Sequence, residues 1–465
     1  MEKAINKGNQ IFENIKKGLS SIYAVPFIFV FAFICSCFES YNLSVLVLAS
    51  LASIILLICD DVKNIFAICF YACFYIATIE INPDWVCYGI AIGIVGISFI
   101  CFIIRKLIIN EQRKNLKKGR MFFPIIISSI AFLLGGLISN FQFLPFIITF
   151  GFCFATITFY WLAVNFTKDL GKYLLRVFVL GAVLVALIMY MQNVRLGKNF
   201  FEIITSTYYM IGAQNPNVAA LFMTLGLIAC FFVAKDKKYR GIFFVVASLL
   251  QYSIIITTCR MMCALSVICF ASLTVYTLIK TQYRLRYIFS MISVLILALM
   301  IFLVDPTVFD ATIVDLLSKA QTSGWNGRDV LWGWCINKFI EHPIFGYGFI
   351  VPIGEEVPAG SIVFNRFILA HNTLLQWLCS LGLVGTALMG YFYFKKYKLV
   401  LKNLFGNLAI SLIILIIEIN GLFDQSPAMD TFIYLIVIVC LASIETNKVK
   451  QKSQQKPSEK DNIKE

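Results

Sequence analysis

Long apolar runs, separated by short polar stretches, recur along the chain from Tyr23 to Ile444. A helix needs about 20 apolar residues to cross the hydrocarbon core of a bilayer, so each run predicts a transmembrane helix. The stretch 241–280 is too long for one span, and we predict a break near Cys259 and Arg260. We expect about fourteen spans. Their predicted starts are Tyr23, Leu43, Ile65, Val86, Met121, Phe141, Leu174, Val218, Gly241, Met261, Tyr287, Thr373, Leu408 and Met429.

The composition indicates the same class of protein. Of the 465 residues, 60% are hydrophobic and only 14% are charged, and the mean hydropathy is +0.85. About a quarter of the residues of a soluble domain are charged, so a soluble fold is excluded. We therefore predict an all-α fold, a polytopic bundle of helices in the cell membrane, with the lipid bilayer as its surroundings.

The net charge of +14 comes from short basic clusters between the apolar runs. This pattern indicates membrane topology, and we expect no nucleic-acid partner. Each cluster follows an even-numbered span, and the N-terminal segment is basic as well. Because basic loops stay in the cytoplasm, both termini are expected there. The clusters lie at 105–120, 168–172, 235–240, 280–286 and 395–402.

One long connection on the outer side interrupts the spans, and a connection of this length is usually functional. Within it, four apolar residues between Ile313 and Ala320 follow helical spacing, and a second helix is expected from Asp329 to Glu341, ended by Pro343. The predicted organisation is a cytoplasmic N-terminus (1–22), about eleven spans (23–304), the external loop (305–370), about three further spans (371–445) and a disordered cytoplasmic tail (446–465).

The sequence carries no signature of a metal or cofactor site. Most of the 15 cysteines lie inside apolar runs, where cysteine is a small apolar side chain, and they form no zinc-binding pattern. The phosphate-binding loop, the dinucleotide-binding glycine pattern and the zinc-protease motif do not occur. We therefore expect neither a metal ion nor a cofactor.

Five basic residues are predicted on the outer face, where such residues are rare: Arg195, Lys198, Arg260, Arg328 and Arg366. Arg260 lies between two apolar runs, and an arginine at the centre of a membrane helix costs about 2.5–3.5 kcal/mol. It therefore requires an interface, a water-filled cavity or an anionic partner. The structural alternative is an arginine that extends to the interface at a helix end. For Arg328 the alternative is a surface ion pair with Asp329.

Two histidines occur, His342 and His371. His371 begins the twelfth predicted span at the outer interface, and a histidine can accept a proton near neutral pH. Asn372 follows it and can cap the helix. A purely interfacial role for His371 is the alternative. His342 precedes Pro343 at a helix end, where a solvated position is the simpler interpretation.

Two consecutive stretches resemble the signature of the O-antigen ligase and polymerase superfamily: GRDVLWGWCINKFIEHPIFGYGF and LAHNTLLQWLCSLGLVGTAL. They contain an arginine before a Trp-containing helix, a His-Pro-x-x-Gly-x-Gly turn, a His-Asn pair at the start of a span and a Gly-Leu-x-Gly sequence. Upstream, AQNPNVAALFMTLGL and TTCRMMCALSV are also similar to the family, except that Cys259 stands where the family usually has serine. The resemblance covers roughly residues 210–390.

The resemblance implies a type-C glycosyltransferase-like bundle with a large external loop, and a polyprenyl-diphosphate-linked glycan as the donor. It implies that Arg260 and Arg328 hold the diphosphate and that His371 is catalytic. Arg366 and Asn372 are further candidates for substrate binding. Arginine binds phosphate through a planar fork and stays charged, so arginines can neutralise a diphosphate without a metal ion.

The resemblance predicts a metal-independent membrane glycosyltransferase that transfers or polymerises the glycan on the outer face during surface polysaccharide biosynthesis. The acceptor is another glycan or a lipid. The abundance of Lys, Ile, Phe and Asn favours polymerisation or attachment of a surface polysaccharide. The main alternative is a transporter or flippase of lipid-linked saccharides, although transporters usually carry their unusual charges at the midplane. A structural scaffold is a third alternative, and it leaves the outer arginines and His371 unexplained.

Overall fold

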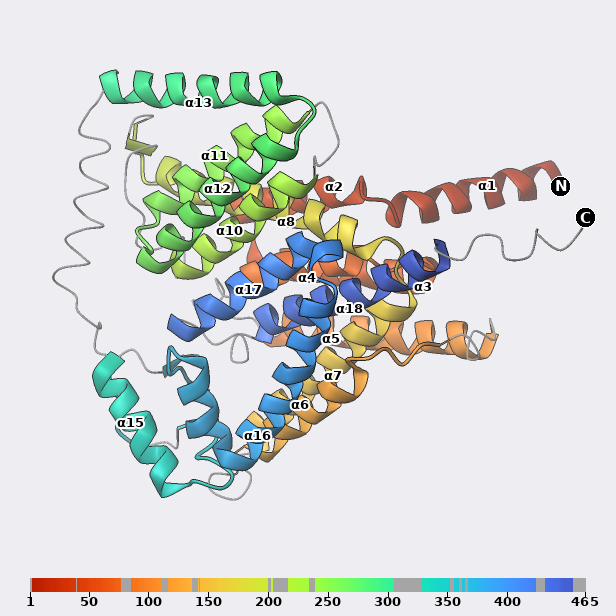
Figure 1. Cartoon of the computed structure of the whole chain (residues 1–465). Coiled ribbons are helices and arrows are strands. Elements are labelled where there is room, and N and C mark those ends of the chain that lie inside the picture. Colours follow the sequence, from red (N-terminus) through yellow and green to blue (C-terminus); the bar gives the residue numbers. More distant parts are fainter. Residues whose placement is uncertain are drawn as a thin grey trace, which may run out of the picture. The chain divides into compact units, whose positions relative to one another are not determined.

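The computed structural model describes most of the chain (Figure 1). The described residues are 2–38, 40–76, 85–109, 116–135, 141, 143–199, 202–203, 216–233, 239–304, 328–351, 355–358, 362–363, 367–423 and 431–454. Several predicted features lie outside them: Arg366, the helical spacing between Ile313 and Ala320, the predicted span start at Met429, most of the basic cluster at 235–240 and the last residues of the C-terminal tail.

The chain forms two compact units, each built from separate stretches of sequence. The first unit comprises Met1–Lys114, Leu174–Asp329 and Leu415–Asp424, and the second comprises Asn115–Tyr173, Val330–Ile414 and Gln425–Glu465. Three helices, α8 (Leu170–Arg195), α15 (Arg328–Glu341) and α17 (Leu408–Phe423), pass from one unit into the other.

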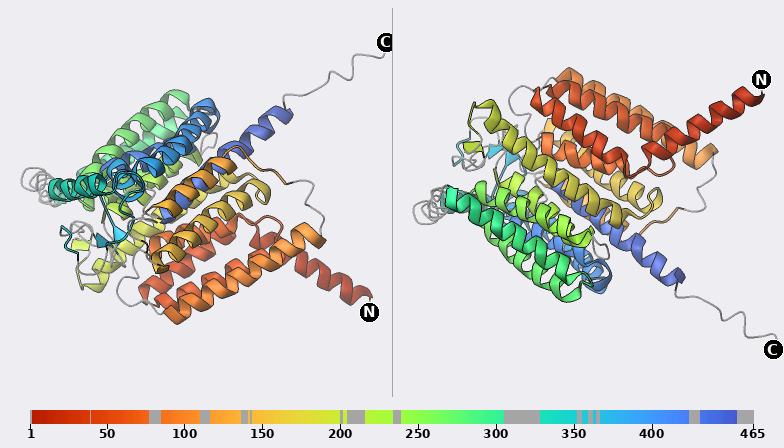
Figure 2. Two further views of the ribbon diagram at one scale, coloured as in Figure 1. Left: turned by 90° about the horizontal axis from the view of Figure 1, so that it is seen from below. Right: turned by 90° about the horizontal axis from the view of Figure 1, so that it is seen from above.

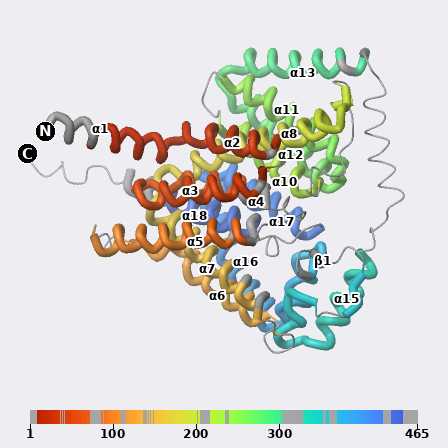
Figure 3. The backbone as a smooth tube through the Cα atoms, turned by 180° about the vertical axis from the view of Figure 1, so that it is seen from behind, coloured from red at the N-terminus to blue at the C-terminus, as the bar shows by residue number. Residues whose placement is uncertain are grey.

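In the first unit, α2–α5 lie side by side (Figure 3). A second group is formed by α10–α13, in which α10 packs against both α11 and α12 (Figure 2). The side chains of α10 are buried from Val218 to Phe231, so α10 is the centre of this group. The bounds are α1 (Glu2–Leu19), α2 (Ala24–Cys37), α3 (Tyr41–Ile58), α4 (Asn64–Ile76), α5 (Trp85–Ile103) with its π-helical extension η2 (Ile104–Ile109), α10 (Pro216–Val233), α11 (Arg240–Ile256), α12 (Arg260–Lys280) and α13 (Arg284–Val304).

In the second unit, α6 packs against α7 and α16, and α18 packs against α7 and α16. A buried carboxylate joins these helices, because Glu445 of α18 accepts the backbone N–H groups of Arg120 and Met121 at the start of α6 and the hydroxyl of Tyr160 in α7. The bounds are α6 (Phe122–Leu134), α7 (Phe143–Asn165), α16 (Thr373–Lys402), η5 (Phe405–Asn407) and α18 (Thr431–Gln454). A two-residue strand β1 (Ile362–Val363) pairs antiparallel with β2 (Phe367–Ile368).

The prediction of an all-α membrane bundle is confirmed. Each predicted span start lies within a few residues of a helix start. Among the described residues, six helices are long and apolar enough to cross a membrane, and further apolar helices are shorter than 18 residues. The predicted loop helix is α15, and the predicted break in 241–280 separates α11 from α12. Two helices extend beyond expectation: the polar N-terminal segment contains α1, and α18 continues to Gln454, past the predicted start of the tail.

Candidate functional site

His371 lies directly before α16, in the second unit, and its backbone adopts the left-handed conformation with φ of 49°. Few residues other than glycine adopt this conformation, and those that do cluster at functional sites. Asn372 is the N-cap of α16, since its side-chain oxygen accepts the N–H of Leu375 at 3.0 Å. The predicted cap is therefore confirmed. His371 is partly buried, next to this fixed helix start.

The peptide groups on both sides of Ala370 are held by the side chains of Trp332, which is partly buried, and Gln376, which is buried. The carbonyl oxygen of Ala370 accepts the indole N–H of Trp332 in α15 at 3.0 Å. Its N–H donates to Oε1 of Gln376 at 2.8 Å, and the amide of Gln376 donates to Ser380 at 2.9 Å. Ala370, Gln376 and Ser380 are fully buried. Because buried hydrogen bonds are costly to break, the backbone before His371 has one defined position.

The glycine-containing turn of 342–348 lies along the first part of α16. The N–H groups of Tyr347 and Gly348 donate to the carbonyl groups of Cys379 and Ser380 at 2.7 and 3.1 Å. In the opposite direction, Leu383 donates to the carbonyl of Pro343 at 2.8 Å. These bonds satisfy the backbone groups of α16 that its own kink leaves unpaired.

The close approach of turn and helix requires glycine at two positions. A Cβ atom on Gly346 would lie 2.4 Å from the carbonyl carbon of Ser380, and one on Gly382 would lie 2.4 Å from the backbone nitrogen of Gly346. Gly382 has φ of 63° and ψ of −166°, a conformation that is essentially restricted to glycine. Both glycines therefore allow two backbones to touch, and together they fix the turn on α16.

An apolar cluster attaches α15 to the same part of α16. Leu331 and Cys335 of α15 pack with Tyr347, Ile368 and Cys379 in this buried cluster. The side chains of Cys335 and Cys379 are both buried in this cluster. The residues that precede and follow His371 are thus supported by α15 from one side and by the glycine turn from the other.

A charged cluster covers the C-terminal half of α15. The ammonium group of Lys338 lies 2.6 Å from Glu355 and 2.9 Å from Glu341, and Glu355 also accepts the hydroxyl of Tyr347. Burial alone would lower the pKa of Lys338, but the hydrogen bonds to Glu355 and Glu341 outweigh it and raise the pKa. Lys338 is therefore a permanent cation that is already neutralised by its neighbours.

Arg260 is the first residue of α12, in the first unit, and it is partly buried. The connection from α11 consists of the buried residues Thr257, Thr258 and Cys259. Thr258 has φ of 53°, an unusual conformation for a β-branched residue, which costs of order 1–3 kcal/mol. The structure thus places Arg260 at a break between two apolar helices, as the sequence predicts, and the backbone at this break is strained.

Arg328 is the first residue of α15, also in the first unit, and it is partly buried. Its guanidinium group donates to the carbonyl oxygen of Phe423, the last residue of α17. A cation at the C-terminus of a helix is favourable, because the last carbonyl groups carry partial negative charge. The two arginines belong to the first unit, whereas His371 and Asn372 belong to the second.

Sequence reasoning missed the residues that hold His371 in place: Trp332, Gln376, Gly346 and Gly382. Trp332 and both glycines occur within the stretches that carry the resemblance, but their partners become evident only in the structure. Gln376 had a usable signal, because it is an isolated polar residue in the apolar run LLQWL. In the part of the chain that the structure describes, His, Cys, Asp and Glu side chains do not gather in groups of three as metal ligands.

Residues 243–390 match the family model described as O-antigen ligase. This segment contains α12 with Arg260, α15 with Arg328, the glycine turn and the start of α16 with His371. A comparison of the chain with curated protein sequences finds no significant match. The residues that carry the resemblance lie largely within the matched segment, and over residues 243–390 the chain is similar to the O-antigen ligase family.

Proposed function

We propose that the protein transfers or polymerises a polyprenyl-diphosphate-linked glycan on the outer face of the cell membrane, as a step of surface polysaccharide biosynthesis. The observation that carries this proposal is the support of His371, whose preceding peptide is fixed by Trp332 and Gln376 within the matched segment. A general base is efficient only when its position relative to the substrate is defined, and this arrangement supplies that definition.

In the proposed reaction, His371 accepts the proton of an acceptor hydroxyl group. The hydroxyl oxygen forms a bond to the anomeric carbon of the donor sugar, and the bond from that carbon to the diphosphate oxygen breaks. The polyprenyl diphosphate leaves with the electron pair of the broken bond. The donor is already activated, so the enzyme supplies proton transfer and charge stabilisation.

Arg260 and Arg328 are proposed to neutralise the departing diphosphate without a metal ion, and Arg366 is a third candidate. A guanidinium group has five donors, so Arg328 can bind the carbonyl of Phe423 and still present donors to a phosphate group. Both arginines begin helices, α12 and α15, whose N-terminal N–H groups also favour an anion. The main role proposed for Asn372 is to cap the N-terminus of α16, beside the proposed substrate.

The orientation of the proposed enzyme follows from the distribution of basic residues. Basic clusters in alternate connections favour cytoplasmic termini and an outer position for the connection that contains α15 and the glycine turn. The apolar spans then accommodate the polyprenyl chain, and the loop contacts the sugars. The acceptor is a second lipid-linked glycan for a polymerase, or another lipid for a ligase.

The test is donor turnover by the purified full-length protein in proteoliposomes containing a short polyprenyl-diphosphate oligosaccharide. We expect release of polyprenyl diphosphate together with a longer glycan, in the presence of a chelator as well as in its absence. A transporter would instead move the intact donor across the bilayer, and this outcome would overturn the proposal. Products that grow by whole repeats would identify a polymerase, whereas a single transfer to an added acceptor would identify a ligase.

A further inference from the structure

The N-terminal helix α1 has one apolar face that no other described part of the first unit covers. Ile11, Phe12 and Ile15 lie on this face at helical spacing, and they are 53%, 49% and 50% exposed. Gln10 and Lys17 lie on the opposite face and are exposed as well. A helix with one apolar and one polar face is suited to the boundary between lipid headgroups and acyl chains.

The helix α1 is too polar to be a membrane span. Its 18 residues include six charged side chains, and such residues are costly in the hydrocarbon core. The following helix α2 exposes Phe27, Val30 and Ile34, as a lipid-facing span does. The segments Asn9–Leu19 and Ala24–Cys35 are bent by 68° relative to each other, so α1 turns away from the direction of α2.

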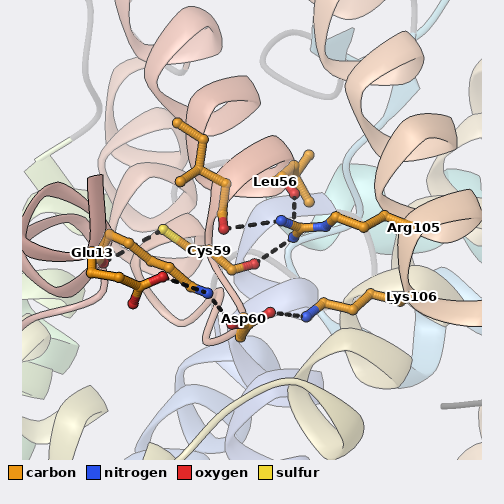
Figure 4. A network of polar contacts seen from close by, with 8 residues as sticks. Glu13, Leu56, Cys59, Asp60, Arg105 and Lys106 are labelled. Atoms are coloured by element: carbon orange, nitrogen blue, oxygen red, sulfur yellow. Dashed lines mark hydrogen bonds and ion pairs between the residues drawn. The ribbon is translucent and has the colours of Figure 1, made fainter. Parts of the chain in front are cut away.

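Ion pairs fix the C-terminal end of α1 on the connection between α3 and α4. The ammonium group of Lys16 lies 2.5 Å from Asp60, which is also paired with Lys106 of η2 (Figure 4). Burial would raise the pKa of Asp60, but the hydrogen bonds to Lys106 and Lys16 outweigh it and lower the pKa to about 2. Asn64 donates to the carbonyl oxygens of Leu19 and Ser21 at 2.5 and 2.9 Å. The angle at which the chain enters α2 is therefore fixed.

The contacts of Arg105 show that this network lies at the end of a membrane span. Its guanidinium group donates to the carbonyl oxygens of Ile58, Leu56 and Cys59 at 2.9, 3.1 and 2.6 Å, respectively (Figure 4). These carbonyls belong to the C-terminal end of α3, which is also where the apolar run of α3 ends. Charged side chains at the end of apolar helices mark the headgroup region. The helix α1 leaves the bundle at that level.

We propose that α1 binds the surface of the bilayer, with Ile11, Phe12 and Ile15 inserted among the first acyl carbons and the helix parallel to the membrane plane. The helix carries four lysines and two glutamates, so its net charge is positive and the partner is a surface that contains anionic phospholipid. Covering three half-exposed apolar side chains favours insertion, and the basic charge directs it to anionic headgroups. This proposal is independent of the catalytic activity.

The test uses the full-length protein in nanodiscs made of phosphatidylcholine and phosphatidylglycerol. A trifluoromethyl-phenylalanine is placed at Phe12 in one sample and at Gln10, on the opposite face, in the matched control. Fluorine relaxation is then measured with a nitroxide carried by the lipid near its headgroup and with a water-soluble gadolinium chelate. Both replaced residues are exposed, so neither label disturbs the core.

We expect the lipid-borne nitroxide to increase the relaxation rate at position 12 several-fold more than at position 10, and the soluble chelate to give the reverse. In nanodiscs of phosphatidylcholine alone, the difference in relaxation rate between positions 12 and 10 should be smaller. Equal protection of both positions from the chelate, with strong relaxation by a nitroxide at the acyl-chain end, would show a broken span and overturn the proposal. A response at position 12 to neither reagent would show that protein covers this face, and would overturn it as well.

Discussion

The two groups of proposed site residues are held in different ways. In the second unit, the backbone before His371 is fixed by Trp332 and Gln376, and the glycine turn is in direct backbone contact with α16. In the first unit, Arg260 and Arg328 are the first residues of α12 and α15, on long side chains that extend from helix starts. A general base must lie within hydrogen-bonding distance of the proton that it accepts, whereas a cation stabilises a diffuse phosphate charge from a range of positions. The difference predicts that small shifts impair His371 more than they impair the arginines.

The largest effect is expected from His371→Ala. Removing the proposed base should lower kcat by about 10²–10⁴-fold and leave KM for the donor nearly unchanged, because the proposed contacts of the arginines with the diphosphate are retained. Donor turnover in proteoliposomes measures both constants, and a normal amount of inserted protein shows that folding is intact.

His342→Ala is the matched control, since it removes the other histidine and should retain most of the activity. Full activity of His371→Ala would remove this residue from the mechanism.

The second-largest effect is expected from Gly382→Ala. The added Cβ would lie 2.4 Å from the nitrogen of Gly346, in a conformation that alanine avoids, so the turn must separate from α16. Backbone strain alone costs about 1–3 kcal/mol, and we expect a lower unfolding temperature together with a large loss of kcat.

Gly333→Ala in α15 is the control, because a Cβ there meets no atom within 4 Å. This substitution should leave the unfolding temperature unchanged or raise it slightly. If both alanine variants behaved alike, the contact between turn and helix would not support the site.

Arg328→Lys is expected to have a smaller effect, of a different kind. Lysine keeps the charge but lacks the planar fork, so one charge-assisted hydrogen bond, about 1.5–3 kcal/mol, should be lost. We expect kcat/KM for the donor to fall by about tenfold to a hundredfold, with part of the loss in KM. Undiminished donor turnover would contradict a bidentate phosphate contact at this position.

Trp332→Phe should have the smallest effect, and it tests the support of His371 directly. Phenylalanine keeps the packing against the apolar cluster but removes the donor to the carbonyl of Ala370, which costs about 0.5–1.5 kcal/mol. We expect a fall of a few-fold to about tenfold in kcat with an unchanged KM. A change confined to KM would show that Trp332 acts on substrate binding instead.

Hydrophobic patterning predicts the helices well, since an apolar run long enough for the bilayer must be helical to satisfy its own backbone. It also predicts the break before Arg260 and the cap at Asn372, because both depend on residues adjacent in sequence. The contact between Gly346 and Gly382 depends on segments 36 positions apart, and a single sequence does not show that they meet.

The two compact units were not predicted either, because each combines three separate stretches of sequence. The amphipathic character of α1 was present in the spacing of Ile11, Phe12 and Ile15. Three apolar residues among charged ones lower the average hydropathy too much for a search based on long apolar runs. The periodicity of 3.6 residues would have been the informative signal.

The glycine-to-glycine contact also determines how this protein can be recombined with its relatives. Because α16 exchanges backbone hydrogen bonds with the turn on both sides of Gly382, the loop and the first part of this helix form one indivisible cassette. A chimaera with a junction between Pro343 and Gly385 would pair a foreign turn with a native helix and lose this fit. Junctions placed before α15 and after Gly385 would exchange the two partners together and would keep their fit.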